Sequence, residues 1–121
     1  MEQLVKDIYK ILSCYNTYAD ELPLKDEFGE ELDYLNNSYV TYKIGNSSDR
    51  SYKDIYDLEV QVITNKVNKF IAQKIGLEID SKLNKTKLTN ARINRKNAWL
   101  VRFVDEDSKE NIVLQYDINI F

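Results

Sequence analysis

The sequence predicts an α+β fold: one curved, mainly antiparallel sheet of about four or five strands, with two helices packed on one face. Apolar residues recur at helical spacing in two segments, and they alternate with polar residues in several others. Each of these segments has only one apolar side, so we expect the helices to cover the apolar face of the sheet. A chain of 121 residues is long enough for a single domain with one hydrophobic core.

Both helices are predicted from apolar residues spaced three and four apart. The first helix is expected over about residues 2–18 and the second over about residues 66–76. The apolar stripe of the first comprises Leu4, Val5, Ile8, Ile11, Leu12 and Tyr15. The stripe of the second comprises Val67, Phe70, Ile71 and Ile75. Gly76 follows that stripe directly and is predicted to be the C-cap glycine that ends the second helix.

The strands are predicted from alternation of apolar and polar residues. They are expected at about residues 38–45, 54–64, 87–94, 98–105 and 110–120. The alternation is most regular in the last of them, whose apolar residues are Ile112, Leu114, Tyr116, Ile118 and Ile120. An acidic excursion of about residues 19–36 precedes the first strand, and its length favours a role in function.

The charges are distributed unevenly along the chain. Seven acidic residues and one lysine lie between Asp20 and Asp33, whereas nine basic and two acidic residues lie between Lys66 and Lys96. Unlike patches on identical subunits favour a head-to-tail contact, although two solvated surfaces would give the same pattern. The candidate subunit contacts are Glu30, Glu31 and Asp33 on the acidic side and Arg92, Arg95 and Lys96 on the basic side.

The composition argues against an enzyme. The chain has no histidine and a single cysteine, Cys14, which excludes the usual histidine-assisted nucleophiles and Cys/His zinc sites. Its three glycines are too far apart for a phosphate-binding loop or a dinucleotide fingerprint. We therefore predict no catalytic residue, no cofactor and no metal, and we expect Cys14 to be a small buried apolar residue.

Three weaker patterns suggest a binding or catalytic site, but each also has an ordinary structural explanation. The stretch DLEVQ resembles the acidic strand of metal-dependent nucleases, but Gln61 stands where a lysine is expected. The turn DEDSKE lacks the glycine and the glutamate spacing of a calcium-binding loop, so a solvated turn is expected. Trp99 lies among basic residues and suits stacking on a nucleic-acid base, but packing in the sheet or at a subunit contact is the favoured explanation. The chain shows neither a signal peptide nor an apolar span, so an intracellular protein without membrane contact is expected.

The order of elements resembles the tail-terminator proteins of long-tailed bacteriophages, also called tail-completion or head–tail joining proteins. The resemblance rests on the strand SYVTYKIG, the strand containing DLEVQVI, and the aspartate-rich turn before the final alternating strand. It implies a structural protein of the virion, located at the head–tail junction of the tail and made in the host cytoplasm. It further implies a homohexameric ring that caps the tail tube protein and joins the head connector protein, with DNA passing through the lumen without specific binding.

Two other classes of function remain open. A small phage-encoded inhibitory or regulatory protein that binds a host protein would have the same size, acidity and lack of catalytic residues. A nucleic-acid-binding module that uses the region Lys82–Arg102 is the second alternative, and its affinity would fall steeply with salt.

Overall fold

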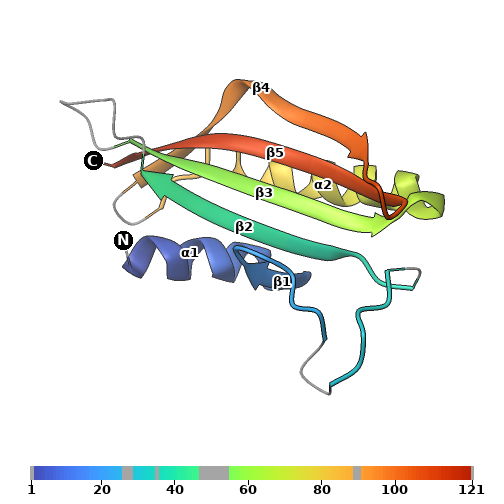
Figure 1. Cartoon of the computed structure of the whole chain (residues 1–121). Helices are drawn as coiled ribbons and strands as arrows, with labels where there is room; N and C mark the ends of the chain where they lie inside the picture. The colour runs from blue at the N-terminus through green and yellow to red at the C-terminus, as the bar shows by residue number, and fades with distance from the viewer. Residues whose placement is uncertain (1, 26–28, 35, 47–54, 89–90, 121) are drawn as a thin grey trace.

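A computed structural model describes residues 2–25, 29–34, 36–46, 55–88 and 91–120. Within these residues, five strands form one sheet and two α-helices form a layer on it, which confirms the predicted α+β class (Figure 1). In chain order the elements are α1 (Glu2–Leu12), β1 (Asn16–Ala19), β2 (Tyr39–Asn46), β3 (Ile55–Asn65), the 3-10 turn η1 (Lys66–Asn68), α2 (Lys69–Leu83), β4 (Ala91–Val104) and β5 (Lys109–Ile120).

The sheet has the strand order β1-β2-β3-β5-β4. The pairs β2–β3, β3–β5 and β5–β4 are antiparallel, whereas β1 lies parallel to β2 with Asn16 opposite Tyr39. The strand β1 was not predicted, because the first helix was expected to continue to residue 18. The helix ends at Leu12, whose carbonyl accepts hydrogen bonds from the Tyr15 NH at 3.1 Å and from Thr17 Oγ1 at 2.7 Å. These local bonds compete with further helical turns, and the β-branched and aromatic residues that follow favour an extended chain.

Both helices pack on the same face of the sheet, as expected. In Figure 1 α2 runs behind β3 and β5, and it contacts both strands. A single hydrophobic core joins the helices to the sheet, because Leu4, Ile8 and Leu12 of α1 belong to the same buried cluster as Ile79 and Leu83 of α2. The alternation predicted for β5 is confirmed, since Ile112, Leu114, Tyr116 and Ile118 are fully or almost fully buried in this core.

The predicted end and the predicted core face of the second helix are both wrong. The helix continues past Gly76 to Leu83, and Gly76 is buried in its middle. A Cβ atom at Gly76 would lie 3.1 Å from Ile112 Cγ2, so the glycine lets α2 approach β5 closely. The buried side of α2 is formed by Ala72, Gly76, Ile79, Asp80 and Leu83, which leaves most of the predicted stripe on the outer side of the helix.

A larger side chain at Gly76 is expected to destabilise the fold by overpacking. Gly76→Leu should lower the free energy of unfolding by about 1–3 kcal/mol, measured by denaturant titration. Gly45→Leu is the matched control, because Gly45 is exposed and a Cβ atom there meets nothing within 4 Å. Equal losses in the two variants would contradict the close approach of α2 to β5.

The two strands predicted at about residues 87–94 and 98–105 are one strand, β4, with an irregularity in its middle. Arg95 pairs with Tyr116 and Leu100 pairs with Leu114, so four residues of β4 stand opposite Gln115 alone. Such a bulge bends the strand and turns side chains away from the regular alternation, and Figure 1 shows β4 arching away from β5. Because the bulge interrupts the alternation of apolar and polar residues, the sequence pattern predicted two strands where there is one.

In the parts of the chain that the structure describes, no helix is long and apolar enough to cross a bilayer.

Candidate functional site

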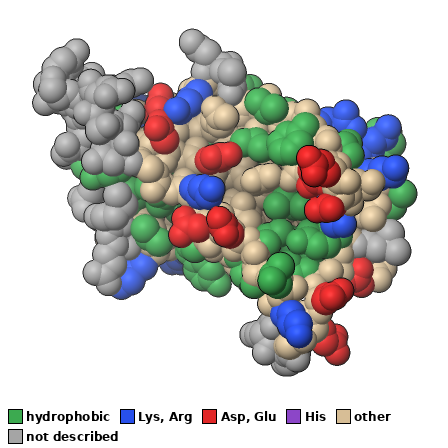
Figure 2. All heavy atoms as spheres, in the orientation of Figure 1, with side chains coloured by type: hydrophobic (Ala, Val, Ile, Leu, Met, Phe, Trp, Pro, Cys, Tyr) green, Lys and Arg blue, Asp and Glu red, His purple; other side chains and the backbone are tan. Residues whose placement is uncertain are grey.

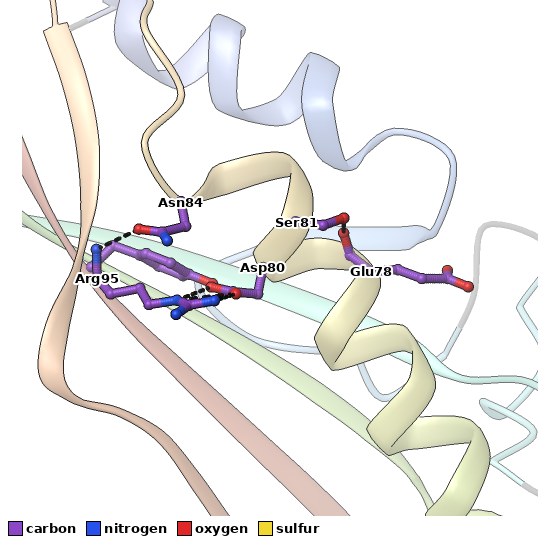
Figure 3. Close-up of polar contacts among 6 residues, drawn as sticks. Glu78, Asp80, Ser81, Asn84 and Arg95 are labelled. Atoms are coloured by element: carbon purple, nitrogen blue, oxygen red, sulfur yellow. Dashed lines mark hydrogen bonds and ion pairs between the residues drawn. The ribbon is translucent and has the colours of Figure 1, made fainter.

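The predicted contact residue Arg95 is engaged within the subunit. Its guanidinium group forms an ion pair with the buried Asp80 of α2 (Figure 3). The same guanidinium group also stacks over the ring of Trp99 at 4.3 Å. The Tyr116 hydroxyl donates to Asp80 Oδ1 at 2.8 Å, and the Arg95 NH donates to Asn84 Oδ1 at 3.1 Å. Burial and the bond to Asp80 raise the pKa of Tyr116, so the hydroxyl stays protonated and keeps donating. This cluster holds α2 against β4 and β5, and it fixes Trp99 at the edge of the core.

Lys96 is also paired internally. Its ammonium group lies 2.7 Å from Asp57 Oδ1 and 3.8 Å from Asp117 Oδ1, and these two aspartates are opposite each other on β3 and β5. Lys96 therefore reduces the repulsion between two adjacent carboxylates. Figure 2 shows acidic side chains around a basic one on the left of the sheet face turned away from α2. Of the predicted basic contact residues, Arg92 is exposed on β4 and remains a candidate for an external partner.

The acidic contact residues lie at the opposite edge of the sheet. Glu30, Glu31 and Asp33 are exposed on the excursion between β1 and β2, whereas Arg92, Arg95 and Lys96 belong to β4. One subunit therefore does not bring the two sets together, and it presents them at two different edges. Two different edges that carry unlike charge suit a head-to-tail contact between copies.

The acidic excursion between β1 and β2 is a projecting arm, and a β-bridge and hydrogen bonds join its described residues. The backbones of Lys25 and Glu31 pair as an isolated antiparallel β-bridge. Gly29, which lies between them in the chain, has a φ of +80° that glycine adopts without strain. At its base the Asp33 NH donates to the Tyr39 hydroxyl at 3.0 Å, and the Asp33 carboxylate accepts from the side chain of Asn36 at 2.7 Å. Figure 1 shows the arm extending well beyond the sheet. Leu24, on the arm, has 92% of its surface exposed.

The sequence did not reveal an exposed apolar stripe on α2, because three of its four residues were predicted to face the core. Val67 is 67% exposed, Phe70 72%, Ile71 51% and Leu77 58%. They follow helical spacing on the outer side of η1 and α2, and we call these four residues the α2 stripe. An open groove runs beside them, lined by Phe70, Gln73, Lys74, Leu77, Glu78 and Ser81. The core side of α2 is indicated by a second pattern in the sequence, in which Ala72, Gly76, Ile79 and Leu83 recur three or four residues apart.

A second group of exposed apolar residues lies on β4 after its bulge. It consists of Leu100, Val101, Phe103 and Val104. The strand β4 is an edge of the sheet, and its first half is covered by backbone bonds from the Lys85 NH to the Ile93 carbonyl and from the Leu88 NH to the Ala91 carbonyl. On the face turned away from α2, Figure 2 shows hydrophobic side chains gathered toward the right. Surfaces of this kind are typical of protein–protein contact.

The residues that formed the weaker chemical patterns make structural contacts within the fold. Gln61 Nε2 donates to Asn111 Oδ1 at 2.7 Å, so the residue at the nuclease lysine position ties β3 to β5. Cys14 is exposed, which corrects the expectation of a buried residue, and its sulfur lies 3.1 Å from Lys82 Nζ. Among the described residues there is no group of three or more acidic or cysteine side chains placed to hold a metal ion.

The aspartate-rich turn is organised by Asp105. Its carboxylate accepts hydrogen bonds from the backbone NH groups of Asp107 and Lys109, each at 2.9 Å, and from Asn111 Nδ2 at 3.0 Å. Burial alone would raise the pKa of Asp105, but these hydrogen bonds outweigh it and lower the pKa. The carboxylate that suggested a calcium ligand is thus satisfied by its own turn.

The lowered pKa of Asp105 predicts a specific loss of stability in acid. Because the pKa is lower in the folded than in the unfolded chain, the stabilisation is fully present above about pH 4 and is lost as the pH falls through the folded pKa. Asp105→Asn keeps the shape of the side chain and removes the titration, so thermal melts of the variant should depend less on pH below about pH 4. Asp107→Asn is the control, because it makes the same change in net charge in the same turn and keeps the hydrogen bonds that the Asp105 carboxylate accepts. An unchanged profile in Asp105→Asn would contradict this role.

The sequence also predicts that the fold needs no metal. Thermal stability should be unaffected by EDTA and by added magnesium or zinc, since an ion that binds only the folded state would raise the melting temperature. A rise of several degrees with an ion at low micromolar concentration would contradict this expectation. Melting curves with and without each ion provide the measurement.

Comparison with known proteins identifies the fold. No family model and no curated protein sequence matches this chain. A solved structure described as "Virion of native gene transfer agent (GTA) particle" contains a similar chain, with a TM-score of 0.59 and 16% sequence identity. The match covers 98% of this chain and 89% of that chain, so it includes both helices and the whole sheet. The protein therefore shares its fold with a component of a gene transfer agent virion.

Proposed function

We propose that this protein is a structural component of a phage-like virion, and that it acts as a tail terminator. Copies of the chain assemble into a ring, taken to be a hexamer, which caps the tail tube protein and presents a surface to the head connector protein. DNA passes through the lumen of the ring without specific binding. The observation that carries the proposal is the fold shared along nearly the whole chain with a component of a gene transfer agent virion.

The distribution of charge supports assembly from identical copies. The acidic arm and the exposed lysines Lys66, Lys69 and Lys74 of η1 and α2 belong to different elements, so a head-to-tail contact can join unlike surfaces, and such contacts close into a ring when the rotation fits. Three basic residues of β4 form internal ion pairs: Arg95 with Asp80, Lys96 with Asp57 and Arg102 with Glu110. This internal pairing reduces the number of cations offered to phosphate and favours a protein partner over nucleic acid.

Electron microscopy of tail tubes tests the proposed function. Purified tube protein is polymerised with and without this chain, and the tube lengths and tube ends are compared. A terminator shortens the tubes and adds a ring at one end. Mass measurement across protein concentration gives the number of copies. Unchanged tube lengths and bare ends would exclude the terminator function and would favour an inhibitory protein that binds a host protein.

A further inference from the structure

We propose that the arm of one copy docks on the α2 stripe of the next copy, so that α2 and η1, rather than β4, form the receiving surface of the subunit contact. This inference rests on the proposed self-assembly and goes beyond it by naming both halves of the contact. The arm is the segment of about residues 20–34 between β1 and β2, of which the structure describes residues 20–25 and 29–34.

The receiving surface combines apolar side chains with cations. The α2 stripe is more than half exposed at each of its four positions. A stripe of this width normally faces a core or a partner, and the core side of α2 is already occupied by Ala72, Ile79 and Leu83. Lys66, Lys69 and Lys74 lie beside the stripe on the same outer side, and all three are exposed. The ammonium group of Lys69 lies over the ring of Phe70 at 5.1 Å, which places positive charge directly on the apolar surface.

The arm has the complementary chemistry. It carries Leu24, which is 92% exposed, and the exposed acids Glu21, Glu30 and Glu31. The backbone bridge between Lys25 and Glu31 and the anchoring of Asp33 to Tyr39 order the described residues of the arm before any partner binds. Preformed shape reduces the loss of conformational entropy on docking. An apolar side chain among acids on the arm therefore faces apolar side chains among lysines on the α2 stripe.

The base of the arm lies next to η1 of its own subunit, because the Tyr34 carbonyl accepts a hydrogen bond from the Asn65 NH at 3.0 Å, and the outer part of the arm can reach another copy. The arm leaves the sheet between β1 and β2 and points away from it, whereas α2 lies behind β3 and β5 (Figure 1). The surfaces are unlike, so the contact is heterologous and each copy offers one donor and one receiver. Arg95 and Lys96, which the sequence suggested as receivers, are held by Asp80 and Asp57, so docking on α2 does not require breaking these pairs.

A complementation experiment with two variants tests the inference. One variant carries Phe70→Asp and Leu77→Asp, which blocks the receiver and leaves the arm intact. The other carries Leu24→Asp and Glu31→Lys, which blocks the arm and leaves the receiver intact. All four positions are exposed, so circular dichroism and melting curves should match those of the parent. Sedimentation velocity should show that each variant alone is monomeric at concentrations where the parent associates, and that an equimolar mixture forms a 1:1 dimer and nothing larger.

A charge-matched pair separates a specific contact from a general effect of net charge. Lys69→Glu with Lys74→Glu should weaken self-association about tenfold or more and should reduce its dependence on salt. Lys10→Glu with Lys43→Glu makes the same change in net charge at exposed positions on α1 and β2, and it should leave association close to that of the parent.

The outcomes distinguish this inference from the proposed function. If the parent associates and both blocked variants associate equally well, the docking of the arm on α2 is wrong, while a ring built through other surfaces stands. If the parent stays monomeric at millimolar concentration, the inference is also wrong, and the tube-length assay alone decides the proposed function. If the receiver variant loses binding to tail tubes yet the parent never associates with itself, the α2 stripe contacts a foreign protein and the inference is overturned.

Discussion

An aspartate in place of Leu114 is expected to leave the protein unfolded at room temperature. Leu114 is completely buried at the centre of β5, between Val60 of β3 and Leu100 of β4. The substitution removes a large apolar side chain from the core and places a carboxylate there without a partner. Each effect costs several kcal/mol, and the whole fold of a domain is stable by only about 5–15 kcal/mol. Circular dichroism and a melting curve provide the measurement.

The neighbouring residue supplies the control for this variant. Gln115 lies on the other face of the same strand and is only half-buried, so Gln115→Asp introduces the same carboxylate without entering the core. It should melt within a few degrees of the parent. Ile118 is also completely buried, so Ile118→Asp should be unfolded like Leu114→Asp. If Leu114→Asp and Ile118→Asp melted like the parent, β5 would not face the core and the described layer arrangement would be wrong.

The second large effect is expected at Arg102. The Glu110 side chain is completely buried and forms an ion pair with Arg102, which is itself partly exposed. Arg102→Met leaves that carboxylate buried without its cation, and breaking a buried pair in this way typically costs about 3–5 kcal/mol. Denaturant titration should therefore show a large decrease in the free energy of unfolding.

A double variant separates the loss of the pair from the loss of packing. Adding Glu110→Gln to Arg102→Met removes the buried charge and should restore more than half of the lost stability. Arg92→Met, at an exposed position on the same strand, is the matched control and should change stability by less than about 0.5 kcal/mol. A loss in Arg102→Met as small as the loss in Arg92→Met would contradict a stabilising role for this pair.

The sequence alone predicted those helices and strands whose pattern of apolar residues fits only one type of structure. In β5 the alternation from Ile112 to Ile118 fits only a strand with one buried face, and the structure confirms it. In α1 the stripe containing Leu4, Ile8 and Leu12 is also confirmed, because no second apolar stripe competes with it. The class of the fold follows from these elements together with the paired strands β2 and β3.

The remaining elements depend on contacts between distant parts of the chain. The segment from Val67 to Leu83 contains two apolar faces, and only the close approach at Gly76 to Ile112 selects which one is buried. Similarly, β1 is four residues long and exists as a strand because β2 pairs with it. At the candidate contact surface, the sequence located the acidic arm. It did not show that Arg95 and Lys96 are held internally, because Asp80 and Asp57 are far from them in the chain.

The position of β5 within the sheet sets a condition on the timing of folding. It follows every other element in chain order, yet it lies between β3 and β4 and pairs with both along most of its length. While the chain is being synthesised, β4 therefore has no strand to pair with and α2 lacks half of its packing surface until β5 has been made. We expect a chain truncated after Val104 to be degraded rapidly by protease, whereas the full chain resists. Partly made subunits would then present no ordered docking surface, so only finished copies would enter an assembly.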